Sequence, residues 1–323
     1  MPSATIEVRD LAKTYPGDVR ALAGVSFAVP AGSVFSILGP NGAGKSTAMK
    51  ILTTLARPDT GSAHIGGIDV VRDPQQVRRM IGCVAQRSGV DSSATGRENL
   101  TLQGRLHGMS GRKLARRVDE LVEQVDLTAA ASRVAGNYSG GTKRKLDIAM
   151  SLIHRPQVLF LDEPTTGLDP EIRAEIWQQI AALAAIERLT VLLTTHHLEE
   201  ADRLADRVVI LDHGRVVAKG SPSQLKDDLK GDAVQVDLIE PRAVPAAHRA
   251  LAGLEAIREV TIEGCAVRAR VDDAAAAVPL VLAALAADGV NAVSVTVARP
   301  SLHDVYLHYA SRSLSELEEE TTR

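Results

Sequence analysis

The feature that most constrains the fold is a glycine-rich segment, Gly39–Thr47, which lies between a short apolar run and an amphipathic run. Four of its positions match the phosphate-binding pattern G-x-x-x-x-G-K-[ST], namely Gly39, Gly44, Lys45 and Ser46. The preceding run, Val34–Leu38, predicts a buried strand, and Ser46–Leu55 predicts a helix. A strand, a tight glycine turn and a helix N-terminus in this order are typical of an α/β fold.

The same segment has the chemistry to bind a polyphosphate. Glycines let backbone N–H groups approach an anion closely, and the helix N-terminus adds a partial positive charge. Lys45 adds a full charge, and the Ser46 hydroxyl is placed to ligate Mg²⁺. By itself the motif indicates only a nucleoside triphosphate and suits a kinase or a GTPase equally; an accidental turn is the alternative. We expect phosphate contacts from Gly39, Asn41, Gly42, Ala43, Gly44, Lys45, Ser46 and Thr47.

Composition argues against a nucleic-acid partner. The 323 residues carry 37 basic and 40 acidic side chains, a formal net charge of −3, which provides no strong field for a phosphate backbone. Aromatic residues make up 2% of the chain, too few for the stacking platforms that bind single strands. We therefore expect no nucleic acid to bind.

Cysteine usage and hydropathy indicate a cytosolic protein unless a partner carries it to a membrane. Cys83 and Cys265 lack metal-ligand spacing, and we expect both to be buried in a reducing compartment. The N-terminus shows no basic region followed by an apolar stretch, so no signal peptide is expected. The nearest candidate for a span, Ala274–Ala287, is shorter than the ~18 residues needed.

Residues 1–220 alternate short apolar runs with longer amphipathic segments, which predicts one α/β domain. Central strands are expected at Val34–Leu38, Ile81–Ala85, Val158–Leu161, Val191–Thr194 and Arg207–Leu211. Ile6–Val8 and Val25–Val29 predict an antiparallel layer, and Asp212–Arg215 predicts a turn. Residues of about 97–155 predict a helical subdomain. One apolar face of it is formed by Leu114, Val118, Leu121, Val122 and Val125.

The remainder of the chain predicts a second domain. Residues 221–231 are expected to form a linker helix, because Gly220–Ser223 is a helix-start signal. Residues 232–311 follow the order βαββαβ, which is typical of a small α+β, ferredoxin-like module. Residues 312–323 form a polar tail with no assigned function. The expected elements are Val234–Ile239, Pro245–Ala252, Ile257–Ile262, Val267–Val271, a helix within Ala274–Ala287, Ala292–Val297 and a last helix at Ser301–Ala310.

Two further features narrow the function. The strand Val158–Leu161 runs directly into Asp162 and Glu163. Asp162 is suited to hold Mg²⁺ and Glu163 to act as general base on an attacking water, although an acid pair that caps a helix is the alternative. About twenty residues earlier, Ser139–Gly141 forms a second anion-binding nest at a helix start. Two nests suit one triphosphate only if two subunits share it.

These motifs together resemble the ATP-binding cassette family, a class of P-loop NTPase. The family's signature is Leu-Ser-Gly-Gly-Gln, and this chain has Tyr138 and Thr142 at its two ends. The resemblance implies a cassette with a mixed sheet core, an antiparallel β layer and a helical subdomain. It also implies a homodimer in which ATP and Mg²⁺ lie between Gly39–Thr47 of one copy and the nest Ser139, Gly140 and Gly141 of the other.

The remaining family motifs follow in order. The resemblance places Tyr15 against the adenine ring, with a loop or core tyrosine as the alternative. It implies that Gln86 senses Mg²⁺ and water, and that Asp169 crosses the dimer interface. His196 would contact the γ-phosphate, whereas His197 is expected on the surface.

The resemblance also implies a transport function, since a cassette moves nothing by itself. A separate permease would meet the segments Ser88–Asp91 and Thr95–Leu100, and the chain would lie peripherally on the cytoplasmic face of the membrane, touching the bilayer only through that permease. Thr194–Asp202 and the C-terminal domain are similar to the daunorubicin-resistance type of export ATPase. Export of a lipid or glycolipid remains the alternative, followed by a soluble cassette ATPase of translation or DNA repair.

Overall fold

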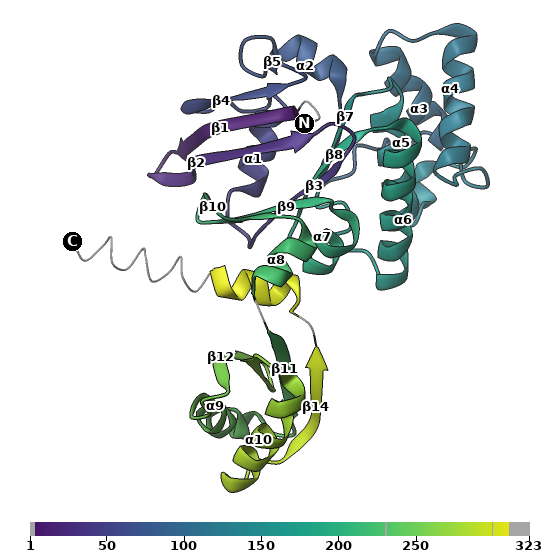
Figure 1. The fold of residues 1–323 in the computed structure, drawn as a ribbon. Coiled ribbons are helices and arrows are strands. Elements are labelled where there is room, and N and C mark those ends of the chain that lie inside the picture. Colours follow the sequence, from purple (N-terminus) through teal and green to yellow (C-terminus); the bar gives the residue numbers. More distant parts are fainter. Residues whose placement is uncertain (1–3, 230, 299, 310–323) are drawn as a thin grey trace. The chain divides into compact units, whose positions relative to one another are not determined.

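The computed structural model describes residues 4–229, 231–298 and 300–309, which divide into two compact units (Figure 1). The first unit extends to Pro222, and the second runs from Ser223 to Tyr309. The predicted linker helix is α8, Pro222–Asp228, and the division places nearly all of it in the second unit. The polar tail 312–323 and the end of the last predicted helix, Ala310, lie outside the described residues.

A six-stranded sheet forms the centre of the first unit. Its strand order is β10-β9-β3-β8-β7-β6, with all neighbours parallel except the edge hairpin β9–β10. Five apolar runs expected to be central strands are strands here, as predicted, and β3 is buried along its whole length. The bounds are Val34–Leu38 (β3), Ile81–Val84 (β6), Val158–Asp162 (β7), Thr190–Thr195 (β8), Arg207–Asp212 (β9) and Arg215–Gly220 (β10).

The predicted antiparallel layer is a second sheet with the order β2-β1-β4-β5. Its apolar side chains share one core with a face of the central sheet and with helix α1, Lys45–Leu52, six of whose residues are buried. A short helix α2, Pro74–Met80, precedes β6. The two predicted strands are longer than the sequence indicated, at Ala4–Tyr15 (β1) and Val19–Pro30 (β2), and two strands that were not predicted, Thr60–Ile65 (β4) and Ile68–Asp69 (β5), complete the sheet.

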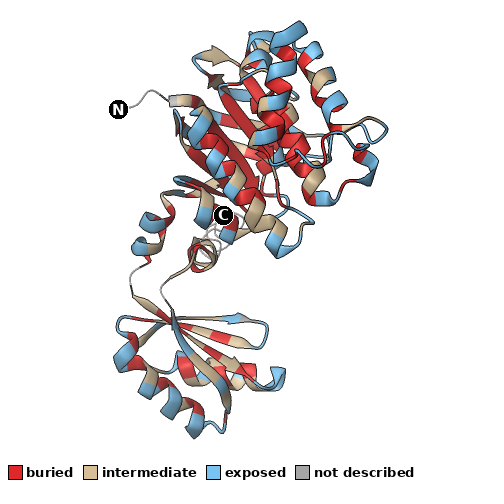
Figure 2. Cartoon of the chain, turned by 90° about the vertical axis from the view of Figure 1, so that its right-hand side faces the viewer, coloured by how far each residue is buried: buried red, intermediate tan, exposed pale blue. Residues whose placement is uncertain are grey.

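Helices cover the other face of the central sheet, and Figure 2 shows the red core between the layers. The predicted helical subdomain contains α3, α4 and α5, and the expected apolar stripe on α4 is buried from Leu114 to Val125. The remaining helices of this unit follow β7 and β8. The bounds are Gly96–Leu106 (α3), Gly111–Gln124 (α4), Gly140–Leu152 (α5), Pro170–Glu187 (α6) and Leu198–Leu204 (α7), with a 3₁₀ turn at Ala135–Asn137.

The second unit contains the predicted βαββαβ module. Its antiparallel sheet has the order β12-β13-β11-β14, with two helices on one side forming a separate core. Residues 302–309 form a further helix, where Asp304 is ion-paired with Arg268 of β13. The other bounds are Asp232–Leu238 (β11), Pro241–Ala243 (a 3₁₀ turn), Val244–Ala252 (α9), Ile257–Glu263 (β12), Ala266–Val271 (β13), Ala274–Ala287 (α10) and Ala292–Ala298 (β14).

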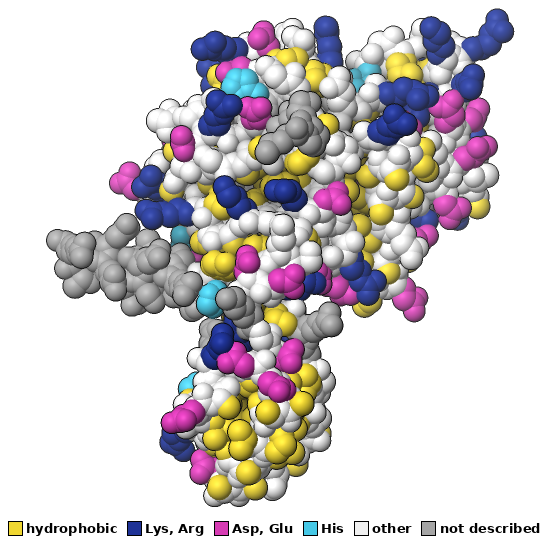
Figure 3. Space-filling view, viewed as in Figure 1, with side chains coloured by type: hydrophobic (Ala, Val, Ile, Leu, Met, Phe, Trp, Pro, Cys, Tyr) yellow, Lys and Arg dark blue, Asp and Glu magenta, His cyan; other side chains and the backbone are white. Residues whose placement is uncertain are grey.

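The surface mixes charges of both signs. On the face drawn in Figure 3, Lys and Arg side chains of the first unit are interspersed with Asp and Glu, and hydrophobic side chains gather on the second unit. Leu280 and Leu282 of α10 are among the exposed apolar residues. In the described part of the chain, no helix combines the length and the apolar character that a bilayer crossing requires.

The expectation that both cysteines are buried is wrong. Cys83 lies on the edge strand β6, where its neighbours Gly82 and Val84 are buried while Cys83 itself is exposed. Cys265 is exposed in the turn between β12 and β13. An apolar run indicates a strand, but strand position in the sheet decides which residues are covered.

We predict that Leu121→Ala lowers the free energy of unfolding of the first unit by about 2–5 kcal/mol, because it opens a cavity at a fully buried position of α4. The matched control is Leu106→Ala on α3, where 74% of the residue is exposed and a change within about 0.5 kcal/mol is expected. Denaturant unfolding followed by the fluorescence of Trp177, the single tryptophan, measures both. Equal losses in the two variants would contradict the assigned packing.

Candidate functional site

The phosphate loop joins the end of β3 to the start of α1. Gly44 caps the helix with a φ of 102°, and a β-carbon there would lie 2.3 Å from the carbonyl oxygen of Ala21. Glycine is therefore required both by backbone conformation and by space. Because the first N–H groups of a helix have no acceptor inside it, the amides at Lys45, Ser46 and Thr47 can donate to an anion.

Lys45 lies inside this loop with 5% of its side chain exposed. Its Nζ donates to the carbonyl oxygens of Gly39 at 2.7 Å and Pro40 at 3.0 Å, and lies 3.9 Å from Oε1 of Glu163. Burial lowers the pKa of the Lys45 ammonium, and the carboxylates of Glu163 and Asp162 oppose that shift. Water screens such a buried cation little, so a phosphate that replaces the carbonyls would be strongly attracted.

A hollow of about 290 Å³ opens above the loop. Tyr15, at the end of β1, lies in its wall with most of the phosphate loop, so the structure brings the predicted adenine contact to the predicted phosphate contacts. Arg20 and Glu163 also line it. Arg20 was not predicted as a site residue; it lies near the start of β2, paired with Thr14 of β1, and its sequence carries no binding motif.

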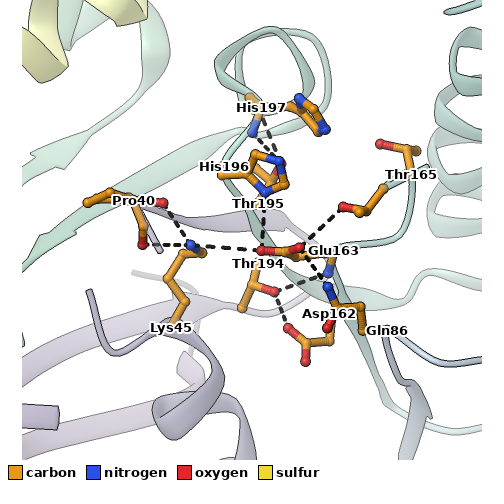
Figure 4. A network of polar contacts seen from close by, with 12 residues as sticks. Pro40, Lys45, Gln86, Asp162, Glu163, Thr165, Thr194, Thr195, His196 and His197 are labelled. Atoms are coloured by element: carbon orange, nitrogen blue, oxygen red, sulfur yellow. Dashed lines mark hydrogen bonds and ion pairs between the residues drawn. The ribbon is translucent and has the colours of Figure 1, made fainter. Parts of the chain in front are cut away.

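The carboxylate of Glu163 is the centre of a polar cluster (Figure 4). Its Oε2 accepts from Nε2 of Gln86 at 3.1 Å and from the hydroxyl of Thr166 at 3.2 Å. Its Oε1 lies 3.2 Å from Nδ1 of His196 and faces Lys45. Gln86, Glu163 and His196 follow three adjacent parallel strands, β6, β7 and β8, whose carboxyl ends meet at one edge of the sheet.

Asp162, at the end of β7, accepts a hydrogen bond from the hydroxyl of Thr194 at 2.5 Å. Among the described residues, no group of three or more His, Cys, Asp and Glu side chains could hold a metal ion. Mg²⁺ does not need such a cage, because it is commonly held by phosphate oxygens, water and one or two protein oxygens. The oxygen donors of Ser46, Gln86 and Asp162 fit that chemistry.

Glu163 has an unusual backbone conformation. Its φ of 47° lies in the left-handed region, which costs a residue with a β-carbon on the order of 1–3 kcal/mol. Its N–H donates to the carbonyl oxygen of Thr194 at 3.1 Å, and its carbonyl oxygen accepts from Nη2 of Arg144 at 3.0 Å. The role of Arg144 is not visible in the sequence, because nothing in its basic stretch distinguishes a buried arginine from an exposed one.

The second nest lies at the start of α5. Ser139 caps the helix and accepts from the backbone N–H of Thr142 at 3.2 Å, while their hydroxyl oxygens are 2.8 Å apart. Thr142, which departs from the family pattern, therefore completes the cap. Tyr138, the other departure, is buried and donates to the carbonyl oxygen of Ala130 at 2.6 Å. A β-carbon at Gly141 would lie 2.4 Å from α6, so glycine is needed there for packing as well.

The predicted site residues fall into two groups within one chain. Tyr15, the phosphate loop and the Glu163 cluster converge, whereas Ser139–Gly141 and Asp169 are not among the described residues that line the hollow above the loop. Asp169 caps α6. The expectation of a surface histidine next to His196 is wrong, because His197 is half-buried and burial, with His196 and Arg173, lowers its pKa.

Comparisons with known protein families agree with this architecture. The family model described as "ABC transporter" matches residues 22–166. The model described as "ATP-binding protein DrrA1-3-like, C-terminal domain" matches residues 220–310. The two matches cover the phosphate loop and the acid pair in one case and the βαββαβ module in the other.

Curated relatives align over almost the whole chain. The daunorubicin resistance ATP-binding protein DrrA2 of Streptomyces coeruleorubidus is 44% identical over 308 residues, 95% of both proteins. The daunorubicin/doxorubicin resistance ATP-binding protein DrrA of Streptomyces peucetius is 43% identical over 310 residues, 95% of this chain and 92% of that protein. The Nod factor export ATP-binding protein I of Burkholderia lata is 40% identical over 237 residues, 73% of this chain and 77% of that protein.

Solved structures similar to the chain are also ATP-binding cassettes. The ATP-binding subunit of an ABC transporter is 30% identical, with a TM-score of 0.62 over 70% of this chain and 93% of that one. A dimeric cassette in a post-hydrolysis state with ADP and Pi is 28% identical, with a TM-score of 0.61 over 67% of this chain and 98% of that one. The predicted P-loop cassette fold and ATPase class are thereby confirmed, and the chain belongs to the ATP-binding cassette family, as an ATPase subunit of the daunorubicin-resistance ATP-binding protein type.

Proposed function

We propose that two copies of this chain bind and hydrolyse ATP to power the export of a hydrophobic, drug-like compound through a separate membrane permease. The observation that carries the hydrolytic part is the convergence of Lys45, Gln86 and His196 on the carboxylate of Glu163. Glu163 lines the hollow above the phosphate loop, where its carboxylate would repel a phosphate but is well placed to take a proton from water.

Each residue of the cluster has a separate role in the proposed reaction. The amides of the phosphate loop and Lys45 bind the β- and γ-phosphates, and Tyr15 packs against the adenine ring. Glu163 accepts a proton from the attacking water, Gln86 orients that water, and His196 contacts the γ-phosphate. Mg²⁺ bound by the oxygens of Ser46, Gln86 and Asp162 would neutralise charge on the phosphates. The chain's own contribution is to hold these groups in one geometry.

The proposal includes a second copy because the nest Ser139–Gly141 does not line the nucleotide hollow of its own chain. Ser139–Gly141 and Asp169 are not among the described residues that line the hollow, so they would serve the nucleotide of a partner. A related cassette, 28% identical, is a dimer with ADP and Pi bound. This relationship supports a dimer, and a head-to-tail arrangement would let each nucleotide contact the phosphate loop of one copy and the nest of the other.

The extent of the similarity favours drug export over lipid or glycolipid export. The daunorubicin-resistance relatives align with 95% of the chain, and the C-terminal module at 220–310 matches their C-terminal domain. The Nod factor export relative aligns with 73%. We infer that the chain lies on the cytoplasmic face of the membrane, that it meets the bilayer only through the permease, and that segments Ser88–Asp91 and Thr95–Leu100 contact that permease.

Glu163→Gln is expected to reduce ATP turnover by about 100-fold or more, because an amide cannot accept the proton. Binding of ATP should persist, so the variant should accumulate as a dimer on size-exclusion chromatography with ATP and Mg²⁺. The parent chain, which turns its nucleotide over, serves as the control. Hydrolysis at the parental rate would refute the role of general base.

Lys45→Ala is expected to weaken binding of a fluorescent ATP analogue by about tenfold or more, since a hydrogen bond from a charged donor contributes roughly 1.5–3 kcal/mol. Lys50→Ala is the matched control, because Lys50 lies in the last turn of the same helix and is exposed. Equal affinities for the Lys45 and Lys50 variants would show that the loop does not bind the phosphates as proposed.

The native complex, isolated from membranes through the tagged chain and reconstituted in vesicles, should transport fluorescent daunorubicin when ATP is added. The same complex with Glu163→Gln should not, because the energy source is lost while assembly is preserved. Transport of a fluorescent lipid in place of daunorubicin would favour the second candidate function. ATP-independent transport would contradict both.

A further inference from the structure

Arg144 is a buried arginine with no role in the steps above. It lies in the second turn of α5 and is 7% exposed. Its guanidinium donates to three backbone carbonyl oxygens, from Nε to Pro164 at 2.5 Å, from Nη1 to Ala85 at 2.8 Å and from Nη2 to Glu163 at 3.0 Å. These acceptors lie directly before Gln86 and at Glu163 itself, so one side chain links the two loops that carry the cluster.

Helix α5 holds the Gln86 loop at a second point as well. Asp147, which is also buried, lies three residues after Arg144 and accepts from the backbone N–H of Gly89 at 3.0 Å. The loop is therefore bound to α5 on both sides of Gln86, at Ala85 and at Gly89. A shift of α5 would move the side chain of Gln86 with it.

The contact with Glu163 acts on a backbone that does not hold its conformation by itself. The left-handed φ of 47° persists because groups on both sides of the residue fix it: Thr194 at its N–H, and Arg144 together with the N–H of Thr166 at its carbonyl oxygen. Without the guanidinium, the carbonyl oxygen of Glu163 keeps only the longer contact with the backbone N–H of Thr166, at 3.3 Å, so the peptide after Glu163 is held less firmly. The carboxylate would then lose its 3.1 Å contact with Gln86.

We propose that Arg144 is a positioning residue for ATP hydrolysis, which holds Gln86 and Glu163 face to face from helix α5. The proposal rests on the proposed function of Glu163 as general base. Because Ser139 caps α5, the same helix that would contact the partner's nucleotide also holds the general base of its own copy in place. Arg144 thus connects the nest of one ATP site to the hydrolytic group of the other.

Charge and geometry both suit an arginine here. The planar guanidinium presents several donors in a fixed arrangement, so it can bind three carbonyls from two loops at once, which a lysine ammonium on a flexible stem does less well. Burial lowers the pKa of Arg144, and the carboxylates of Asp147, Glu200 and Asp162 oppose that shift. Because a guanidinium is not deprotonated in proteins, the side chain keeps all its donors.

The test compares Arg144→Met and Arg144→Lys with the parent, in the full chain with ATP and Mg²⁺. Arg144→Met is expected to lower kcat by about 100-fold, as small displacements of reacting groups do, with KM changed by no more than about twofold. Its ATP-dependent dimer should still form on size-exclusion chromatography, because the nest is intact. Arg144→Lys should recover part of kcat, since an ammonium reaches fewer carbonyls.

Arg117→Met is the matched control. Arg117 of α4 is 3% exposed and donates to the carbonyl oxygen of Leu152 at 2.8 Å and to Glu187 at 3.1 Å, so its loss costs stability without touching either catalytic loop. Its kcat should equal the parent's. If removing any buried arginine had a general effect, the kcat of both variants would fall equally.

Three results would overturn the proposal: an Arg144→Met kcat near the parental value, an equal loss in Arg117→Met, or loss of the ATP-dependent dimer. If Arg144→Met does not fold, Arg144→Lys decides, because a folded lysine variant with parental kcat refutes the positioning role and one with lowered kcat and unchanged KM supports it. Two other results would show that the proposed function itself is wrong: a parent chain without ATPase activity, or a Glu163→Gln variant that hydrolyses ATP at the parental rate.

Discussion

The interaction on which the site depends is the contact of one carboxylate, that of Glu163, with side chains from the phosphate loop and two neighbouring strands. Lys45, Gln86 and His196 approach it because β3, β8, β7 and β6 are adjacent and parallel, so their carboxyl ends open on one edge of the sheet. A buried ammonium and a carboxylate 3.9 Å apart attract strongly where water is excluded. The parallel sheet therefore sets the positions of the loops, and the loops carry the side chains of the site.

At several positions, packing and the chemistry of the site require the same type of residue. Gly44 adopts the left-handed conformation of the helix cap and leaves room for the backbone of Ala21. Gly141 lies in the first turn of α5 and leaves room for α6. Thr142 stands where the family pattern has glutamine, yet its hydroxyl closes the cap with Ser139. Thr142 thus departs from the family pattern but keeps the cap of α5 closed through its hydrogen bond with Ser139.

Most elements were predictable because they depend on local signals. The phosphate loop is fixed by glycines and a lysine close in sequence, and the central strands are continuous apolar runs. The fold of the module after Ser223 was also predictable from the element order βαββαβ, since this order leaves few ways for its four strands to pair. Burial on edge strands was not predictable, and Cys83 is exposed on β6, which lies at the edge of the central sheet.

The sequence by itself determined the two motifs that bind anions, the acid pair Asp162–Glu163 and the fold class, because each depends on residue types at short spacings. Only the tertiary structure decided which of these groups meet. Gln86 and Glu163 are 77 residues apart, and a parallel sheet brings them within 3.1 Å. The same is true of Arg144, whose three acceptors come from two distant loops. Contacts between distant segments depend on strand order, which spacing along the chain does not encode.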